Sequence, residues 1–143
     1  MRVLLFSCLL FGVLAQGVGT AVADDTVYPS ALLADRPALA DQYKTLIEPI
    51  VSDHPWIAAG GTEVPVGDIT LDGSDYLVLS SCKPHACDAQ TIVTLMRPGQ
   101  TKAVGAFTVN RGDKGLGPAE STVTWLGEPD RSERRFMAAF LFR

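Results

Sequence analysis

The stretch YLVLSSCKPHACDAQTIVTLM, residues 76–96, places two strand-like segments on either side of a short loop that two cysteines flank. Its first six and last eight residues are rich in apolar and β-branched side chains, which favour strands. Four residues separate Cys82 from Cys87, and adjacent antiparallel strands readily supply the ~5.5 Å between Cα atoms that a disulfide needs. The stretch therefore predicts a hairpin with a tight loop at its tip, called here the tip loop (residues 82–87).

Further segments with a two-residue period lie before and after this hairpin. They are residues 63–66, a weak or edge strand because of its proline, and residues 68–71, 102–109 and 121–126. Turn signals rich in Gly, Pro and Asp separate them, most clearly Asp72-Gly73. Strands joined by such short turns favour an antiparallel meander.

Helical spacing appears on the N-terminal side of the predicted sheet. Residues 31–51 carry apolar side chains every three or four positions, Asp35 can cap the helix, Pro37 suits its first turn, and Pro49 marks a kink or end. Residues 136–142 are apolar enough for a buried strand or a short helix. One helix followed by a meander indicates the α+β class.

The first 23 residues have the features of a secretory signal peptide. Arg2 precedes an apolar run at 3–15, and Ala21-Val22-Ala23 supplies the small-x-small pattern for cleavage after Ala23. The run covers 13 residues, against the ~20 that span a bilayer, so cleavage is favoured over a retained anchor. We expect a single mature domain, residues 24–143, with no membrane association after cleavage.

Charge and cysteine usage narrow the partners of this mature domain. Cleavage removes Arg2 and no acidic residue, so the net charge moves from −4 to −5, which disfavours nucleic acid and suits a basic partner. Cys8 leaves with the signal, and the even count that remains indicates one disulfide in an oxidising compartment. Thioredoxin-like redox sites have two residues between their cysteines, whereas four separate Cys82 from Cys87. A zinc site would lack ligands, because outside the loop only His54 offers a further soft ligand. We predict neither a metal nor a cofactor.

The tip loop presents a cation, a proline and an imidazole on a closed ring. Pro84 fixes its own φ and restricts Lys83, which leaves His85 little freedom, and a rigid tip loses little entropy on binding. Catalysis by His85 would need a nucleophile, yet Ser80 and Ser81 lack a G-x-S-x-G context, and we predict no catalytic residue. From chemistry alone, a binding tip and a solvated histidine without a role fit equally well.

The six residues Cys82-Lys83-Pro84-His85-Ala86-Cys87 resemble the C-K-P-H-D-C signature of the Ivy family, the periplasmic inhibitors of vertebrate (C-type) lysozyme. Supporting similarity extends to Pro55-Trp56 with Gly60-Gly61, to residues 76–96 and to 123–126, and covers most of residues 38–127. The resemblance implies a central antiparallel sheet of about five strands, flanked by helices, with the disulfide-closed hairpin loop protruding. It also implies a periplasmic protein that is not an enzyme and that defends the cell against host lysozyme.

The mechanism implied by the resemblance is occlusion of the lysozyme cleft by the tip loop. His85 would hydrogen-bond the catalytic carboxylates, which in a retaining glycosidase such as lysozyme lie ~5–5.5 Å apart. Lys83 would add positive charge, and Cys82–Cys87 would close the loop. Ala86 stands where the family has an acidic residue, so any hydrogen bond that this residue forms in the family would be absent here, and Asp88, just outside the bridge, is the candidate to replace it. Six residues cannot fill ~800 Å² per partner, so neighbouring turns must supply a rim.

Two further functions stay open from the sequence. The cell's own lytic transglycosylases also have a carboxylate-bearing glycan cleft, so the tip loop could regulate them instead. A periplasmic binding module in which His85 is incidental belongs to a different class, and it is favoured if His85 is buried against its own domain. The sequence does not determine whether the chain is a monomer or a homodimer.

Overall fold

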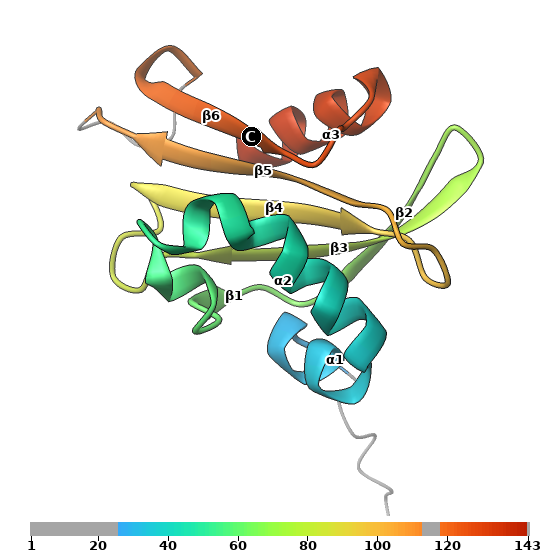
Figure 1. Cartoon of the computed structure of the whole chain (residues 1–143). Coiled ribbons are helices and arrows are strands. Elements are labelled where there is room, and N and C mark those ends of the chain that lie inside the picture. The colour runs from blue at the N-terminus through green and yellow to red at the C-terminus, as the bar shows by residue number, and fades with distance from the viewer. Residues whose placement is uncertain (1–25, 113–117, 143) are drawn as a thin grey trace, which may run out of the picture.

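The computed structural model describes residues 26–112 and 118–142, which form one antiparallel sheet with helices on both of its faces (Figure 1). The helical elements in this part of the chain are α1 (Pro29–Asp35), α2 (Pro37–Val51), α3 (Arg131–Leu141) and the short 3-10 turns η1 (Pro55–Ile57) and η2 (Pro118–Glu120). The strands are β1 (Thr62–Glu63), β2 (Gly67–Leu71), β3 (Ser74–Cys82), β4 (Gln90–Met96), β5 (Ala103–Asn110) and β6 (Ser121–Leu126).

Strands β3 to β6 form a meander, and β3 also pairs with two short strands, β1 and β2. The order of the sheet is β1–β3–β4–β5–β6, and all of the pairings are antiparallel. The hairpin from β2 to β3 turns through Asp72 and Gly73, whose φ angles of 48° and 76° are those of the two-residue turns that match strand twist. The α+β class, the antiparallel sheet and the loop closed by a disulfide are confirmed.

Each face of the sheet has its own core. On one face α2 and η1 contribute Leu46, Ile47, Ile50 and Ile57, which pack on Ile92 and Phe107. On the opposite face Met137 and Leu141 of α3 pack on Val93, Leu95 and Val104. Residues 92–96 of β4 are buried throughout, because this central strand is covered on both sides. The sheet is therefore a rigid support for the loop at its end.

The predicted N-terminal helix is divided into two. α1 ends at Asp35 and α2 begins at Pro37, with Arg36 between them at φ −125° and ψ 82°. Proline restricts the preceding residue to extended backbone, so Arg36 rather than Asp35 occupies the N-cap of α2, without a side-chain cap. Pro49 lies within the last turn of α2, which ends two residues later.

The C-terminal segment is helix, and it begins earlier than the apolar run suggested. Asp130 and Glu133 form a capping box: the Glu133 amide donates to the Asp130 side chain, and the Asp130 amide donates to the Glu133 carboxylate. The Asp130 side chain also accepts from the Ser132 hydroxyl, and the hydrogen bonds from the Glu133 amide and from Ser132 lower the pKa of Asp130. The D-x-x-E pattern at 130–133 is a recognised helix start, and it places the beginning of α3 ahead of the apolar run at 136–142.

The predicted signal peptide, residues 1–23, and its cleavage site after Ala23 lie outside the residues that the structure describes, which begin at residue 26. Among the residues that the structure describes, none belongs to a helix long and apolar enough to cross a membrane.

Candidate functional site

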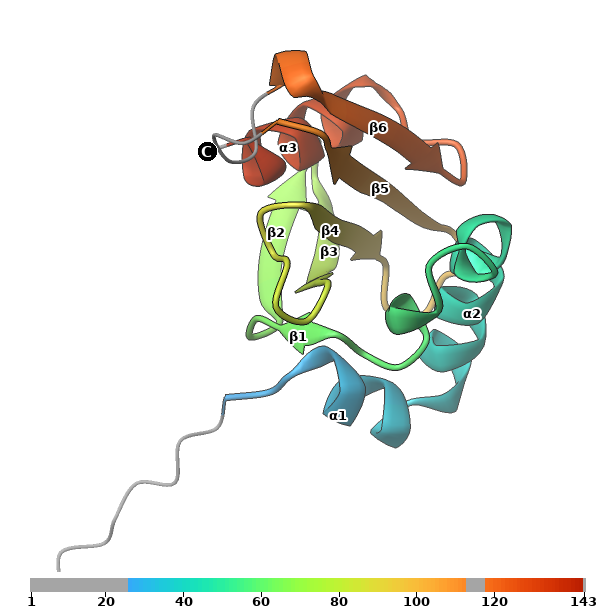
Figure 2. The ribbon, with the colours of Figure 1, turned by 90° about the vertical axis from the view of Figure 1, so that its left-hand side faces the viewer.

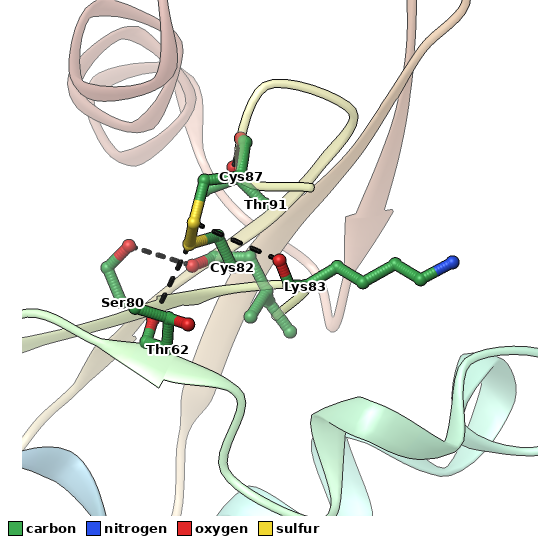
Figure 3. Close-up of a disulfide and its surroundings, with 7 residues drawn as sticks. Thr62, Ser80, Cys82, Lys83, Cys87 and Thr91 are labelled. Carbon is green, nitrogen blue, oxygen red and sulfur yellow. Dashed lines mark hydrogen bonds between the residues drawn. A yellow bond between two sulfur atoms is a disulfide. The ribbon is translucent and has the colours of Figure 1, made fainter. Parts of the chain in front are cut away.

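The tip loop connects β3 to β4 at one end of the sheet. Figure 2 looks at this end, with β1 below the loop and the segment after η1 to one side. Cys82 is the last residue of β3, and its disulfide to Cys87 closes the loop with 4.8 Å between the Cα atoms (Figure 3). Cys87 lies outside the next strand, in a turn over residues 87–89 that returns the chain to β4.

The side chains of Lys83, Pro84 and His85 are exposed. Figure 3 shows the Lys83 side chain extended away from the disulfide. His85 has a φ of 62°, in the left-handed region that non-glycine residues enter at a cost, although histidine tolerates it better than most. His85 is therefore not folded onto its own domain, which removes the argument for an incidental, buried histidine.

Backbone hydrogen bonds within the loop fix its course. The Lys83 amide donates to the Gln90 carbonyl at 3.0 Å, and the Ala86 amide donates to the Lys83 carbonyl at 2.9 Å. The Ala86 carbonyl in turn accepts from the amides of Ala89 and Gln90. The backbone polar groups of Ala86 are thus both engaged inside the loop, whichever side chain this position carries.

The entry arm of the loop, where β3 ends at Cys82, contacts β1 and the segment between η1 and β1. Thr62 pairs with Cys82, and the Thr62 carbonyl oxygen lies 3.5 Å from the Cys82 sulfur. Gly61, with φ 62°, passes so close that a Cβ there would lie 2.6 Å from the Cys82 oxygen and 2.8 Å from the Trp56 ring. The indole of Trp56 donates to the Gln90 side chain at 2.8 Å, so η1 is tied to the start of β4.

The bond between Trp56 and Gln90 joins residues 34 positions apart, so no local pattern predicts it, and Trp56 is partly buried against the core under α2. A histidine in a turn before proline is expected to be exposed, but His54 is half-buried, and its ring centroid lies 4.5 Å from that of Phe107. The Gly60-Gly61 pair was the available signal, since a glycine ahead of a strand indicates a close backbone approach.

The site has the chemistry of a binding surface. Ser80 and Ser81 are buried beneath it, and the Ser80 hydroxyl donates to the Ile92 carbonyl, so neither is placed as an exposed nucleophile. No group of three or more His, Cys, Asp or Glu residues that could hold a metal ion occurs within residues 26–112 and 118–142. The exposed functional groups of the loop are one ammonium and one imidazole on a closed, hydrogen-bonded ring.

Comparison with known proteins gives a consistent picture. The family model described as inhibitor of vertebrate lysozyme (Ivy) matches residues 38–141. A protein of Escherichia coli K12 named inhibitor of vertebrate lysozyme is 29% identical over 115 residues, which cover 78% of this chain and 67% of that protein. A protein of the same name from Pseudomonas aeruginosa is 32% identical over 96 residues, or 60% of each chain.

Proposed function

Because the chain belongs to the Ivy family, we propose that it inhibits C-type lysozyme by inserting the tip loop into the active-site cleft. The observation that carries this proposal is an exposed His85 at the tip of a loop that a disulfide and its own backbone hydrogen bonds hold closed. A preorganised loop binds with less loss of conformational entropy than a flexible one, so its few contacts yield more affinity.

In this mechanism the imidazole of His85 addresses the two catalytic carboxylates of lysozyme. Both ring nitrogens of a protonated histidine donate hydrogen bonds, so one side chain can serve two acceptors ~5–5.5 Å apart. Lys83 adds a second positive charge at the same tip, opposite an anionic cleft. The negative charge of the remaining domain favours fast association with a basic lysozyme.

The rim of the interface is assigned to the chain segments beside the loop. The residues after η1, at positions 58–61, lie at the same end of the sheet as the tip loop. Arg111 follows the last residue of β5, whose backbone amide donates to the Ala89 carbonyl next to the loop, so it lies at this end too. Both are needed because the loop by itself is far smaller than a standard interface of ~800 Å² per partner.

We further assign residues 1–23 to a cleaved signal peptide and residues 24–143 to a single inhibitor domain that acts in the periplasm. The small-x-small pattern before Asp24 and the disulfide, which forms and persists in oxidising compartments, support this assignment.

The test is inhibition of cell-wall lysis by a C-type lysozyme, with the wild type beside His85→Ala. His54→Ala is the matched control, because it removes the other histidine of the chain, which packs on Phe107 in the core. We expect His85→Ala to lose inhibition and His54→Ala to keep it. Equal potency of His85→Ala and wild type would refute the mechanism, and the same assay with a lytic transglycosylase would reveal a target in the cell's own murein metabolism.

A further inference from the structure

The two arms of the tip loop are held in different ways. The entry arm continues β3 and pairs with β1 up to Cys82. The exit arm, residues 87–89, lies outside the sheet, since β4 begins only at Gln90. Its position must therefore come from other contacts, and these decide how the loop leaves the sheet.

Three successive carbonyls of the exit arm accept hydrogen bonds from the neighbouring strands. The Thr91 hydroxyl of β4 donates to the Cys87 carbonyl at 3.0 Å. Asn110, the last residue of β5, donates twice: its side-chain amide to the Asp88 carbonyl at 3.2 Å, and its backbone amide to the Ala89 carbonyl at 2.8 Å. We call the side chains of Thr91 and Asn110 the exit-arm clamp.

The amide of Asn110 is fixed in direction at both ends. Its side-chain oxygen accepts from the Gly112 amide at 2.9 Å while its nitrogen donates to Asp88, and the residue is 8% exposed. A hydrogen bond shielded from water in this way is stronger and more directional than an exposed one. The Asn110 half of the clamp therefore constrains the backbone of the exit arm more than the solvent-exposed bond of Thr91 does.

The constraint matters because of the residue that precedes the exit arm by two positions. His85 has a φ of 62°, a conformation that persists in a non-glycine residue only where the surrounding structure enforces it. The disulfide fixes the two ends of the ring, and Pro84 fixes φ before His85. Beside the backbone hydrogen bonds within the loop, the clamp adds a side-chain restraint on the side where the chain returns to the sheet.

We propose that Asn110, assisted by Thr91, is a positioning residue for inhibition: it holds the exit arm so that the His85 imidazole keeps the orientation that enters the cleft. This inference rests on the proposed function of the loop. Asn110 itself is buried and would not touch lysozyme, so its contribution to affinity would be wholly indirect.

Asn110→Asp tests the clamp with minimal change of shape. A carboxylate retains the oxygen that accepts from Gly112, but it cannot donate to the Asp88 carbonyl. Thr91→Val, which removes the donor to Cys87, is the second variant should Asn110→Asp fail to fold. Thr108→Val is the matched control, because it deletes a buried hydroxyl of β5 that donates to the Thr91 carbonyl within the sheet.

Two measurements are made on the oxidised protein at a temperature where every variant is folded. The first is the ¹⁵N order parameter of the His85 amide without lysozyme, which we expect to fall toward flexible values, below ~0.6, in Asn110→Asp and Thr91→Val only. The second is the Kd for a C-type lysozyme, which we expect to rise about five- to tenfold in the same two variants and to stay unchanged in Thr108→Val.

Each result bears on the proposal. An unchanged Kd in Asn110→Asp would overturn the positioning role. A higher Kd together with an unchanged order parameter of the His85 amide would overturn it as well. A comparable rise in Kd for Thr108→Val would mean that general destabilisation of the fold weakens binding, and this result would also overturn the positioning role. Failure of the proposed function is distinguished by His85→Ala binding as tightly as wild type, whatever the clamp variants do.

Discussion

Replacing Glu133 by alanine should destabilise the fold by about 2–5 kcal/mol, the sum of the contacts that its buried carboxylate makes. The Glu133 side chain is 1% exposed and joins α3 to the sheet. Its carboxylate accepts from the Tyr76 hydroxyl at 2.9 Å, from the Asp130 amide at 2.8 Å and from the Lys102 ammonium at 3.4 Å. These partners come from β3, from the start of α3 and from the segment before β5.

The magnitude follows from the three contacts. The buried Tyr76 hydroxyl would lose its acceptor, which costs about 1–3 kcal/mol. Loss of the bond to the Asp130 amide, one half of the capping box, costs about 1 kcal/mol. The side chain of Lys102 is 45% exposed, so its ion pair is screened and contributes at most about 1 kcal/mol. The effect is a large part of the total stability of a domain, about 5–15 kcal/mol.

The assay is urea unfolding followed by tryptophan fluorescence and circular dichroism, with Glu128→Ala as the control. Glu128 is exposed, so its removal should change the free energy of unfolding by less than about 0.5 kcal/mol. Tyr76→Phe should cost about 1–2 kcal/mol in the wild type and almost nothing in Glu133→Ala, because the hydroxyl there has already lost its acceptor. A loss below about 1 kcal/mol for Glu133→Ala would show that the buried carboxylate does not tie α3 to the sheet.

Three further predictions follow from the geometry. Gly61→Ala should cost about 2 kcal/mol or more and loosen the tip loop, since its Cβ would lie 2.6 Å from a backbone oxygen; Gly99→Ala, also at positive φ but with nothing within 4 Å, should cost only about 1 kcal/mol. Burial raises the pKa of Tyr43 and of Tyr76 to about 12 from 10.0, so both stay protonated in the folded state at pH values where the unfolded chain ionises. The stability that these two protonated hydroxyls contribute is complete below pH 10 and should be lost as the pH rises toward about 12. Replacing both tyrosines by Phe should make the urea midpoint of unfolding less dependent on pH over this range. Affinity for lysozyme should increase as the pH falls from about 8 to about 6, because an ionised carboxylate favours the imidazolium of His85, and a flat titration of the wild type by calorimetry would contradict this mechanism.

Elements that depend on near neighbours in the chain could be predicted closely. The predicted strand at 121–126 coincides with β6, β4 begins one residue later than predicted, and β5 is shifted by one residue at both ends. The Asp72-Gly73 turn and the Cys82–Cys87 bridge were also predictable, because turn geometry and a four-residue spacing are local properties. The family resemblance of the tip loop rests on the same local sequence.

Local patterns thus predicted the class of the fold, the hairpin and the chemistry that its tip presents, because strand period, turn residues and cysteine spacing act over a few positions. The contacts that hold the tip in place arise from the packing of distant segments: the indole of Trp56 on Gln90, the close passage of Gly61 beside Cys82, and the amide of Asn110 on the exit arm. These contacts join residues about 20 or more positions apart. Their geometry is set by how the strands pair and how the helices cover the sheet, which no local pattern specifies.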